Sequence, residues 1–304
     1  MTSRYLHKFV LLAGCGLIAA AMDAPSRADS LPAGTAPAET VIVTAPKLDA
    51  ATLDEAAPAF VEARTKLSPI HQVARWRAPL CPSTEGLPPA FNDFVSARMR
   101  AIAARVGAAA EKNCKPNVQV IFTADPQKAA EQVAEHSPWL FGMWYGTDAL
   151  RIAKIDRPIE AFYVTASVES SGRQMTDHPD APVGVTGSNR ALYDSRLGQN
   201  RMSVFENVLI FADRAKISGY DVGAVADYIS VLALSQVEPG DGCSGLPSIV
   251  DLLAEGCTGD RKPNSLTSVD EEFLKALYET DPRRAGLAAR TNIARRMAAV
   301  LAGR

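Results

Sequence analysis

The chain has 304 residues, of which 47% are hydrophobic and 22% charged, a composition that suits one globular domain of moderate size with tails. The formal net charge of −2 gives no reason to expect nucleic acid or an anionic membrane surface as a partner. The function must therefore be sought in individual segments of the chain.

The N-terminus, residues 1–28, is predicted to be an export signal. Arg4 and Lys8 supply a positively charged start, and the apolar stretch over residues 9–22 is short for a transmembrane span. Ser26-Arg27-Ala28 fits a cleavage site with small residues at both ends. We therefore expect a periplasmic or secreted protein with no transmembrane span in the mature chain.

A lipoprotein signal is the alternative. Leu12-Ala13-Gly14-Cys15 matches a bacterial lipobox, which would anchor the mature chain through a lipid on Cys15. We favour ordinary cleavage, because the lipobox leaves only residues 9–14 as the apolar region, while apolar residues continue beyond the cysteine.

Residues 29–66 are predicted to be an Ala- and Pro-rich linker that contains a possible short helix over residues 53–67. Within this linker, the segment Glu39-Thr40-Val41-Ile42-Val43-Thr44 resembles the TonB box of outer-membrane transporters. No transporter barrel is visible in the sequence that follows, so we favour a chance match.

The rest of the chain, residues 67–304, is predicted to form a single α+β domain, in which helices pack on one twisted mixed sheet. The predicted strands are apolar segments, rich for the most part in β-branched and aromatic residues, at residues 70–80, 118–122, 159–168 and 204–211. The predicted helices that precede residue 200 cover residues 91–106 and run from 126 toward 136, the second N-capped by Asp125. A long surface loop is expected over residues 170–199.

A further predicted helix begins at Asp221 and is expected to end at Pro239-Gly240. Its apolar residues recur at helical spacing, at Val222, Val225, Ile229 and Leu232. A loop between two cysteines follows, and Leu266-Thr267-Ser268-Val269-Asp270 then opens a second helix. This order resembles the second half of a zincin metalloprotease of the metzincin kind.

The zinc ligands of such an enzyme are missing. When Leu232-Ala233-Leu234 is aligned with the residues that follow the metal motif, Ala226 and Ser230 stand where two histidines belong. Asp227 takes the place of the general-base glutamate, and Gln236 that of the third ligand. Because alanine cannot bind metal and serine and glutamine are poor zinc ligands, we expect no catalytic zinc and no cofactor. Asp227 is the one candidate for a catalytic group.

Two other sets of residues leave alternatives open. Asp213, Asp221, Asp227 and Glu238 could meet near this helix and hold a hard cation, although we favour capping and salt-bridge roles for them. The aromatic segment over residues 136–145 could line a groove for a peptide or glycan. We favour a helix end that plugs the core.

The four cysteines that remain after signal cleavage form an even set, as expected for an oxidising compartment. Of the three pairings possible, the local one is predicted, with disulfides Cys81–Cys114 and Cys243–Cys257. Each could stabilise the fold by about 2–4 kcal/mol. Zinc ligation by these cysteines is the alternative, but no CxxC spacing supports it.

Most of the domain, residues 70–297, resembles an uncharacterised family of exported alphaproteobacterial proteins. The segments that carry this resemblance are Ala74-Arg75-Trp76, Pro79-Leu80-Cys81-Pro82, Cys114 with Pro116-Asn117-Val118, Ala226-Asp227-Tyr228, Leu246-Pro247-Ser248-Ile249 and the Leu-Thr and Leu-Tyr pairs of the last predicted helix. The C-terminal half also resembles proteobacterial lipoproteins of unknown function. Neither resemblance implies a reaction.

These observations predict a zincin-like pseudoenzyme, that is, a non-enzymatic binding or scaffolding domain of the bacterial cell envelope. Its expected partner is an envelope protein or peptide, and not nucleic acid. The alternative is a hydrolase with an unconventional site near Asp227.

Overall fold

The computed structural model describes residues 49–169, 171–176, 201–259 and 262–303. Residues Lys47–Arg304 form one compact unit. The predicted export signal, Cys15, the segment that resembles a TonB box and most of the long loop lie outside the described residues.

A five-stranded mixed sheet in the order β1-β2-β5-β3-β4 lies at the centre of this unit. Its strands are β1 (Pro82–Glu85), β2 (Val118–Thr123), β3 (Ile159–Glu169), β4 (Gln174–Thr176) and β5 (Arg201–Asp213). The first two strands and β5 run parallel, whereas β3 is antiparallel to both β5 and β4. Helices and one mixed sheet confirm the predicted α+β class.

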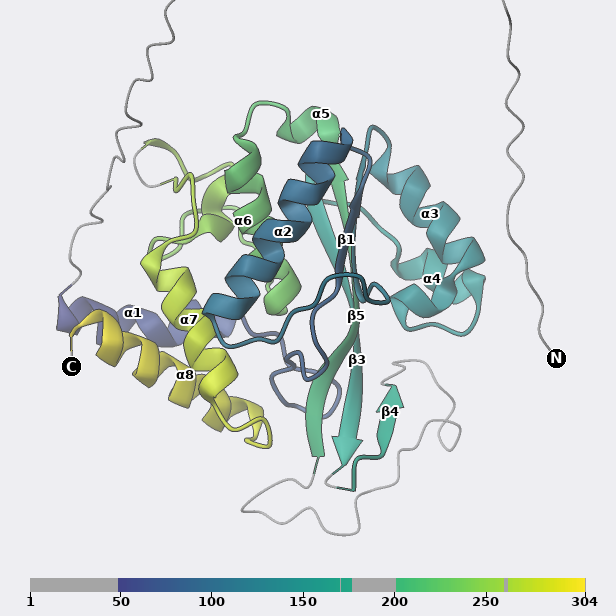
Figure 1. The fold of residues 1–304 in the computed structure, drawn as a ribbon. Helices are drawn as coiled ribbons and strands as arrows, with labels where there is room; N and C mark the ends of the chain where they lie inside the picture. The colour runs from purple at the N-terminus through teal and green to yellow at the C-terminus, as the bar shows by residue number, and fades with distance from the viewer. Residues whose placement is uncertain (1–48, 170, 177–200, 260–261, 304) are drawn as a thin grey trace, which may run out of the picture. The chain divides into compact units, whose positions relative to one another are not determined.

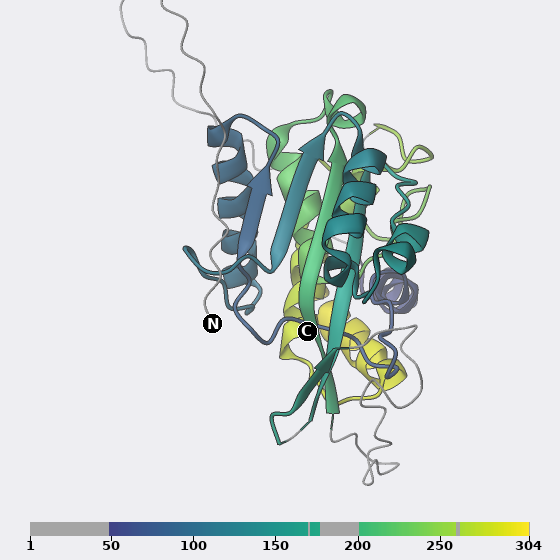
Figure 2. The same ribbon diagram turned by 90° about the vertical axis from the view of Figure 1, so that its right-hand side faces the viewer.

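Helices cover both faces of the sheet, as Figures 1 and 2 show. One face is covered by α2 (Pro89–Arg105) and α6 (Val222–Leu234), beyond which lie α1 (Ala50–Ala63), α7 (Ser268–Glu279) and α8 (Gly286–Leu301). The other face is covered by α3 (Pro126–His136), η1 (Pro138–Phe141) and α4 (Gly146–Ile152). The short α5 (Arg214–Ile217) follows β5, and η2 (Ile249–Leu253) lies between α6 and α7.

Strand β5 shows why both faces are covered. Val208, Ile210 and Ala212 face the core beneath α2 and α6, while Leu209 and Phe211 face the core formed with α3, η1 and α4. A strand that is buried on both faces reads as a continuous apolar run instead of an alternating one.

Helices α3, α6 and α7 begin at side chains that cap them. Asp125 caps α3 and Asp221 caps α6, each through its side-chain carboxylate. Thr267 and Asp270 form a reciprocal capping box at the start of α7. The end of α6 differs from the prediction, since the helix stops at Leu234 and extended backbone at Ser235 precedes Pro239.

The prediction of a strand over residues 70–80 is wrong. This segment forms only isolated bridges, such as Arg75 with Val204, because its apolar residues do not alternate with a period of two. The strand in this region is β1, which begins at Pro82. It occupies the edge of the sheet, where a proline without an N–H group is tolerated.

Helix α1 belongs to the compact unit, although its residues fall in the predicted linker. Leu53, Phe60 and Val61 are buried in the main core, and the helix packs beside α8. The unit therefore begins earlier than residue 67, because α1 has an apolar face that the rest of the chain covers.

Candidate functional site

Helix α6, which carries the zincin-like pattern, lies within the core. Ala226 and Ser230, at the positions of the missing histidines, are both fully buried. The Ser230 hydroxyl donates to the Ala226 carbonyl at 2.6 Å. Gln236 lies beyond the end of the helix and is only partly buried. The helix face that would hold a metal in a zincin is thus packed with small side chains.

Asp227 is a buried acidic residue of α6 that accepts several hydrogen bonds. Its side chain is 1% exposed, and Arg98 of α2 donates to both carboxylate oxygens, from Nε at 2.5 Å and from Nη2 at 3.0 Å. The Leu266 backbone N–H donates to Oδ2 at 2.7 Å. The hydrogen bond to Asp227 also raises the pKa of the Arg98 guanidinium. The carboxylate therefore joins α6 to α2 and to the segment that precedes α7.

The other acidic residues near α6 do not converge on Asp227. Asp213 and Asp221 each accept hydrogen bonds from backbone N–H groups, at the starts of α5 and α6. Glu238 forms an exposed ion pair with Lys66 at 2.5 Å. Among the residues that the structure describes, no group of three His, Cys, Asp or Glu side chains could hold a metal ion. Capping and ion pairing, the roles favoured from the sequence, are the ones observed.

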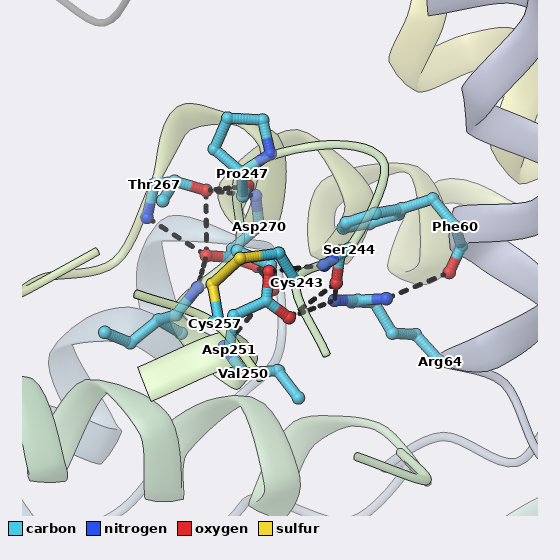
Figure 3. A network of polar contacts seen from close by, with 12 residues as sticks. Phe60, Arg64, Cys243, Ser244, Pro247, Val250, Asp251, Cys257, Thr267 and Asp270 are labelled. Carbon is cyan, nitrogen blue, oxygen red and sulfur yellow. Dashed lines mark hydrogen bonds and ion pairs between the residues drawn. A yellow bond between two sulfur atoms is a disulfide. The ribbon is translucent and has the colours of Figure 1, made fainter. Parts of the chain in front are cut away.

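The Cys243–Cys257 disulfide closes a loop, and a second polar network fixes the position of this loop (Figure 3). The Ser244 hydroxyl donates to Asp251 Oδ1 at 2.5 Å and accepts from Arg64 Nη2 at 2.5 Å. Arg64 is buried, forms an ion pair with Asp251 at 3.6 Å, and stacks over the Phe60 ring. This network fixes the end of α1 against the loop.

Asp270 connects the same loop to α7 (Figure 3). Its carboxylate accepts from the Ser248 hydroxyl at 2.5 Å, from the Ile249 N–H at 2.8 Å, and from both the hydroxyl and the N–H of Thr267. Burial raises the pKa of Asp270, against these hydrogen bonds, which favour the ionised form. All four donors point at one buried carboxylate, so its role is to position two segments.

Arg75 anchors the C-terminal end of α7. It is buried, and its Nη1 donates to the backbone carbonyls of Leu277 and Thr280. Desolvation lowers the pKa of Arg75 to about 10. A cation at a helix C-terminus satisfies carbonyl groups that have no partner within the helix and interacts favourably with the helix dipole.

The sequence did not identify the partners of these buried polar groups, which are the three arginines Arg64, Arg75 and Arg98. Each contacts atoms far away in the chain; Arg98 and Asp227, for example, are 129 residues apart. One signal was present, since Arg75 lies in the Ala74-Arg75-Trp76 segment, where the Trp76 indole also donates to a buried carbonyl, that of Ala233.

The aromatic segment after α3 is split between core and surface. Phe141 and Met143 are buried in the core beneath α3 and α4. Trp139, Trp144 and Tyr145 are exposed. The segment therefore plugs the core with some of its side chains and presents the others at the surface.

Both predicted disulfides are confirmed, Cys81–Cys114 and Cys243–Cys257, with Cα atoms 6.0 Å and 4.6 Å apart. Across the described parts of the chain, no helix has the length and apolar character needed to cross a membrane. Comparison of the chain with protein-family models, with curated proteins and with solved structures finds no match. The resemblance to zincins and to the exported family stays a prediction.

Proposed function

We propose that this protein is a non-enzymatic binding or scaffolding domain of the bacterial cell envelope, exported and held together by two disulfides. The observation that carries the proposal is the state of Asp227. A general base needs a substrate or a water within hydrogen-bond reach. Asp227 is 1% exposed, and both of its oxygens accept from Arg98, with Leu266 as a further donor.

The surroundings of α6 support the same proposal. Ala226 and Ser230 are buried, and the serine hydroxyl is bonded within its own helix. Asp251 and Asp270 are also committed to donors on neighbouring segments. Polar groups arranged in this way fix the positions of helices and loops. This arrangement suits a domain that binds its partner through its surface. The two disulfides favour an oxidising compartment such as the periplasm.

Complementation of a deletion strain with an Asp227→Asn variant tests this proposal. We expect biological activity to be retained, because asparagine can still accept one hydrogen bond from Arg98 or Leu266. Asp221→Asn is the matched control, since it makes the same change on the same helix at the N-cap, where asparagine is equally favoured. Loss of activity in Asp227→Asn alone, with an unchanged melting temperature, would instead favour a hydrolase.

Elemental analysis of the purified protein gives a second, independent readout. The proposed function predicts no stoichiometric zinc or manganese. A metal present at one equivalent and lost from the Asp227→Asn variant would contradict it.

A further inference from the structure

A groove on the surface of the compact unit lies between α1 and α8. These helices lie side by side on the outer side of the helical layer, away from the sheet (Figure 1). Arg290 in α8 reaches Thr65, just beyond the end of α1, so the two helices run antiparallel. Between them is a cavity of about 290 Å³ whose walls include Asp54, Pro58 and Ala298.

The two walls of this groove carry opposite charge. Between Ala50 and Ala63, α1 contains acidic residues and no lysine or arginine. Between Gly286 and Leu301, α8 contains arginines and no acidic residue. Within one copy the pattern already produces an ion pair across the groove, Glu62 with Arg290 at 3.4 Å.

Apolar and uncharged residues on α8 line the groove between these charges. Leu287, Thr291, Ala294 and Ala298 recur at steps of four, three and four residues, so they share one face of α8. Leu287 is 77% exposed, whereas Ala294 and Ala298 are buried at the floor. A large apolar side chain thus stands beside a shallow groove lined by small ones.

We propose that this groove is the contact surface for a second copy of the chain. A two-fold axis through the groove places α1 of one copy over α8 of the other, and the reverse, because such an interface is made of the same patch twice. Acidic α1 then faces basic α8 at both ends, and Leu287 of each copy enters the groove of its partner. Among the described residues, Arg295 on the rim has no acidic partner, and such a contact supplies one.

The size of the surface sets the strength of this dimer. Helices of 14 and 16 residues are about 21 and 24 Å long and lie roughly 8–10 Å apart, which gives a face on the order of 400 Å² per copy. A standard stable interface buries about 800 Å² per partner. The dimer is therefore weak and depends on protein concentration. This inference goes beyond the proposed function and does not depend on it.

Sedimentation equilibrium of the full exported chain, with its disulfides formed, tests the proposal across micromolar to millimolar concentrations. We expect reversible dimerisation whose dissociation constant rises at least about tenfold in Leu287→Glu and in Arg295→Glu, since the first removes an apolar contact with the partner's groove and the second a charged contact on the rim.

Val300→Glu is the matched control, because Val300 is an exposed apolar residue of α8 outside this groove. Melting curves show whether each variant is folded. A wild-type chain that stays monomeric at every concentration would overturn the proposal that a second copy binds in the groove. A dimer that Val300→Glu weakens and Leu287→Glu leaves unchanged would overturn it as well.

Discussion

Removal of the Arg98 guanidinium tests the structural role of the buried carboxylate. Breaking a buried ion pair by deleting one partner costs about 3–5 kcal/mol, because the other charge is left without compensation. Arg98 is 35% exposed, so water reaches this side of the carboxylate, and the Leu266 N–H still donates to Asp227. We therefore expect Arg98→Met to lower the free energy of unfolding by about 2–3 kcal/mol.

A double-mutant cycle separates the pair from its surroundings. Arg98→Met with Asp227→Leu replaces both charges by apolar groups, which is often close to neutral for a buried pair. The Leu266 N–H then lacks its acceptor, so a residual loss of about 1–2 kcal/mol is expected.

Thermal and denaturant unfolding with intact disulfides measures these values. The loss in Arg98→Met corresponds to a fall in melting temperature of roughly 4–12 °C for a unit of this size. An Arg98→Met variant as stable as the wild type, or a double variant no more stable than Asp227→Leu alone, would refute the reasoning.

Three further predictions concern the loop network and one glycine. Burial raises the pKa of Asp270 in the folded chain. At a pH between its ordinary and its raised pKa, this carboxyl is protonated in the folded chain and ionised in the unfolded chain. The free energy of unfolding therefore falls as the pH rises through that interval. That contribution should vanish in Asp270→Asn, as melting curves against pH would show, together with a loss of about 1–3 kcal/mol from donors left unpaired. Replacing Cys243 and Cys257 by serine is expected to cost about 3 kcal/mol in denaturant unfolding, since the disulfide closes a short loop. Gly86→Ala should destabilise severely, because Gly86 has φ +92° and an added Cβ lies 1.8 Å from the Phe122 carbonyl oxygen; an unchanged melting temperature would contradict this close approach.

The elements that the sequence predicted well are those with a strong local signal. Residues 118–122 and 159–168 are rich in β-branched and aromatic residues, and both lie in strands. The helices at Asp125 and Asp221 begin at side chains that cap them. The disulfide pairing is the local one among the three that four cysteines allow.

The elements that were missed depend on contacts distant in sequence. The sequence of β1, Pro-Ser-Thr-Glu, has no apolar residue, and its strand conformation comes from pairing with β2 at the sheet edge. Residues 70–80 contain buried apolar side chains without forming a strand, because Val73 and Trp76 enter the core from irregular backbone.

The candidate site was predictable only in part. The sequence favoured a capping or salt-bridge role for Asp227, and the ion pair with Arg98 is of that kind. That the donors are Arg98 and Leu266 could not be predicted, since α2 and the segment before α7 meet α6 only in the folded chain. The buried partners Arg64 and Asp251 were missed for the same reason.

Complementation by the Arg98→Met, Asp227→Leu double variant tests the central claim most directly, because this variant keeps a packed core and has no carboxylate at the position of the general base. If α6 serves to hold the fold together, the double variant restores the phenotype of the deletion strain to the extent that its stability allows. If the stable, folded double variant fails to complement while Asp221→Asn succeeds, the carboxylate has a chemical role and the protein is not a non-enzymatic binding or scaffolding domain.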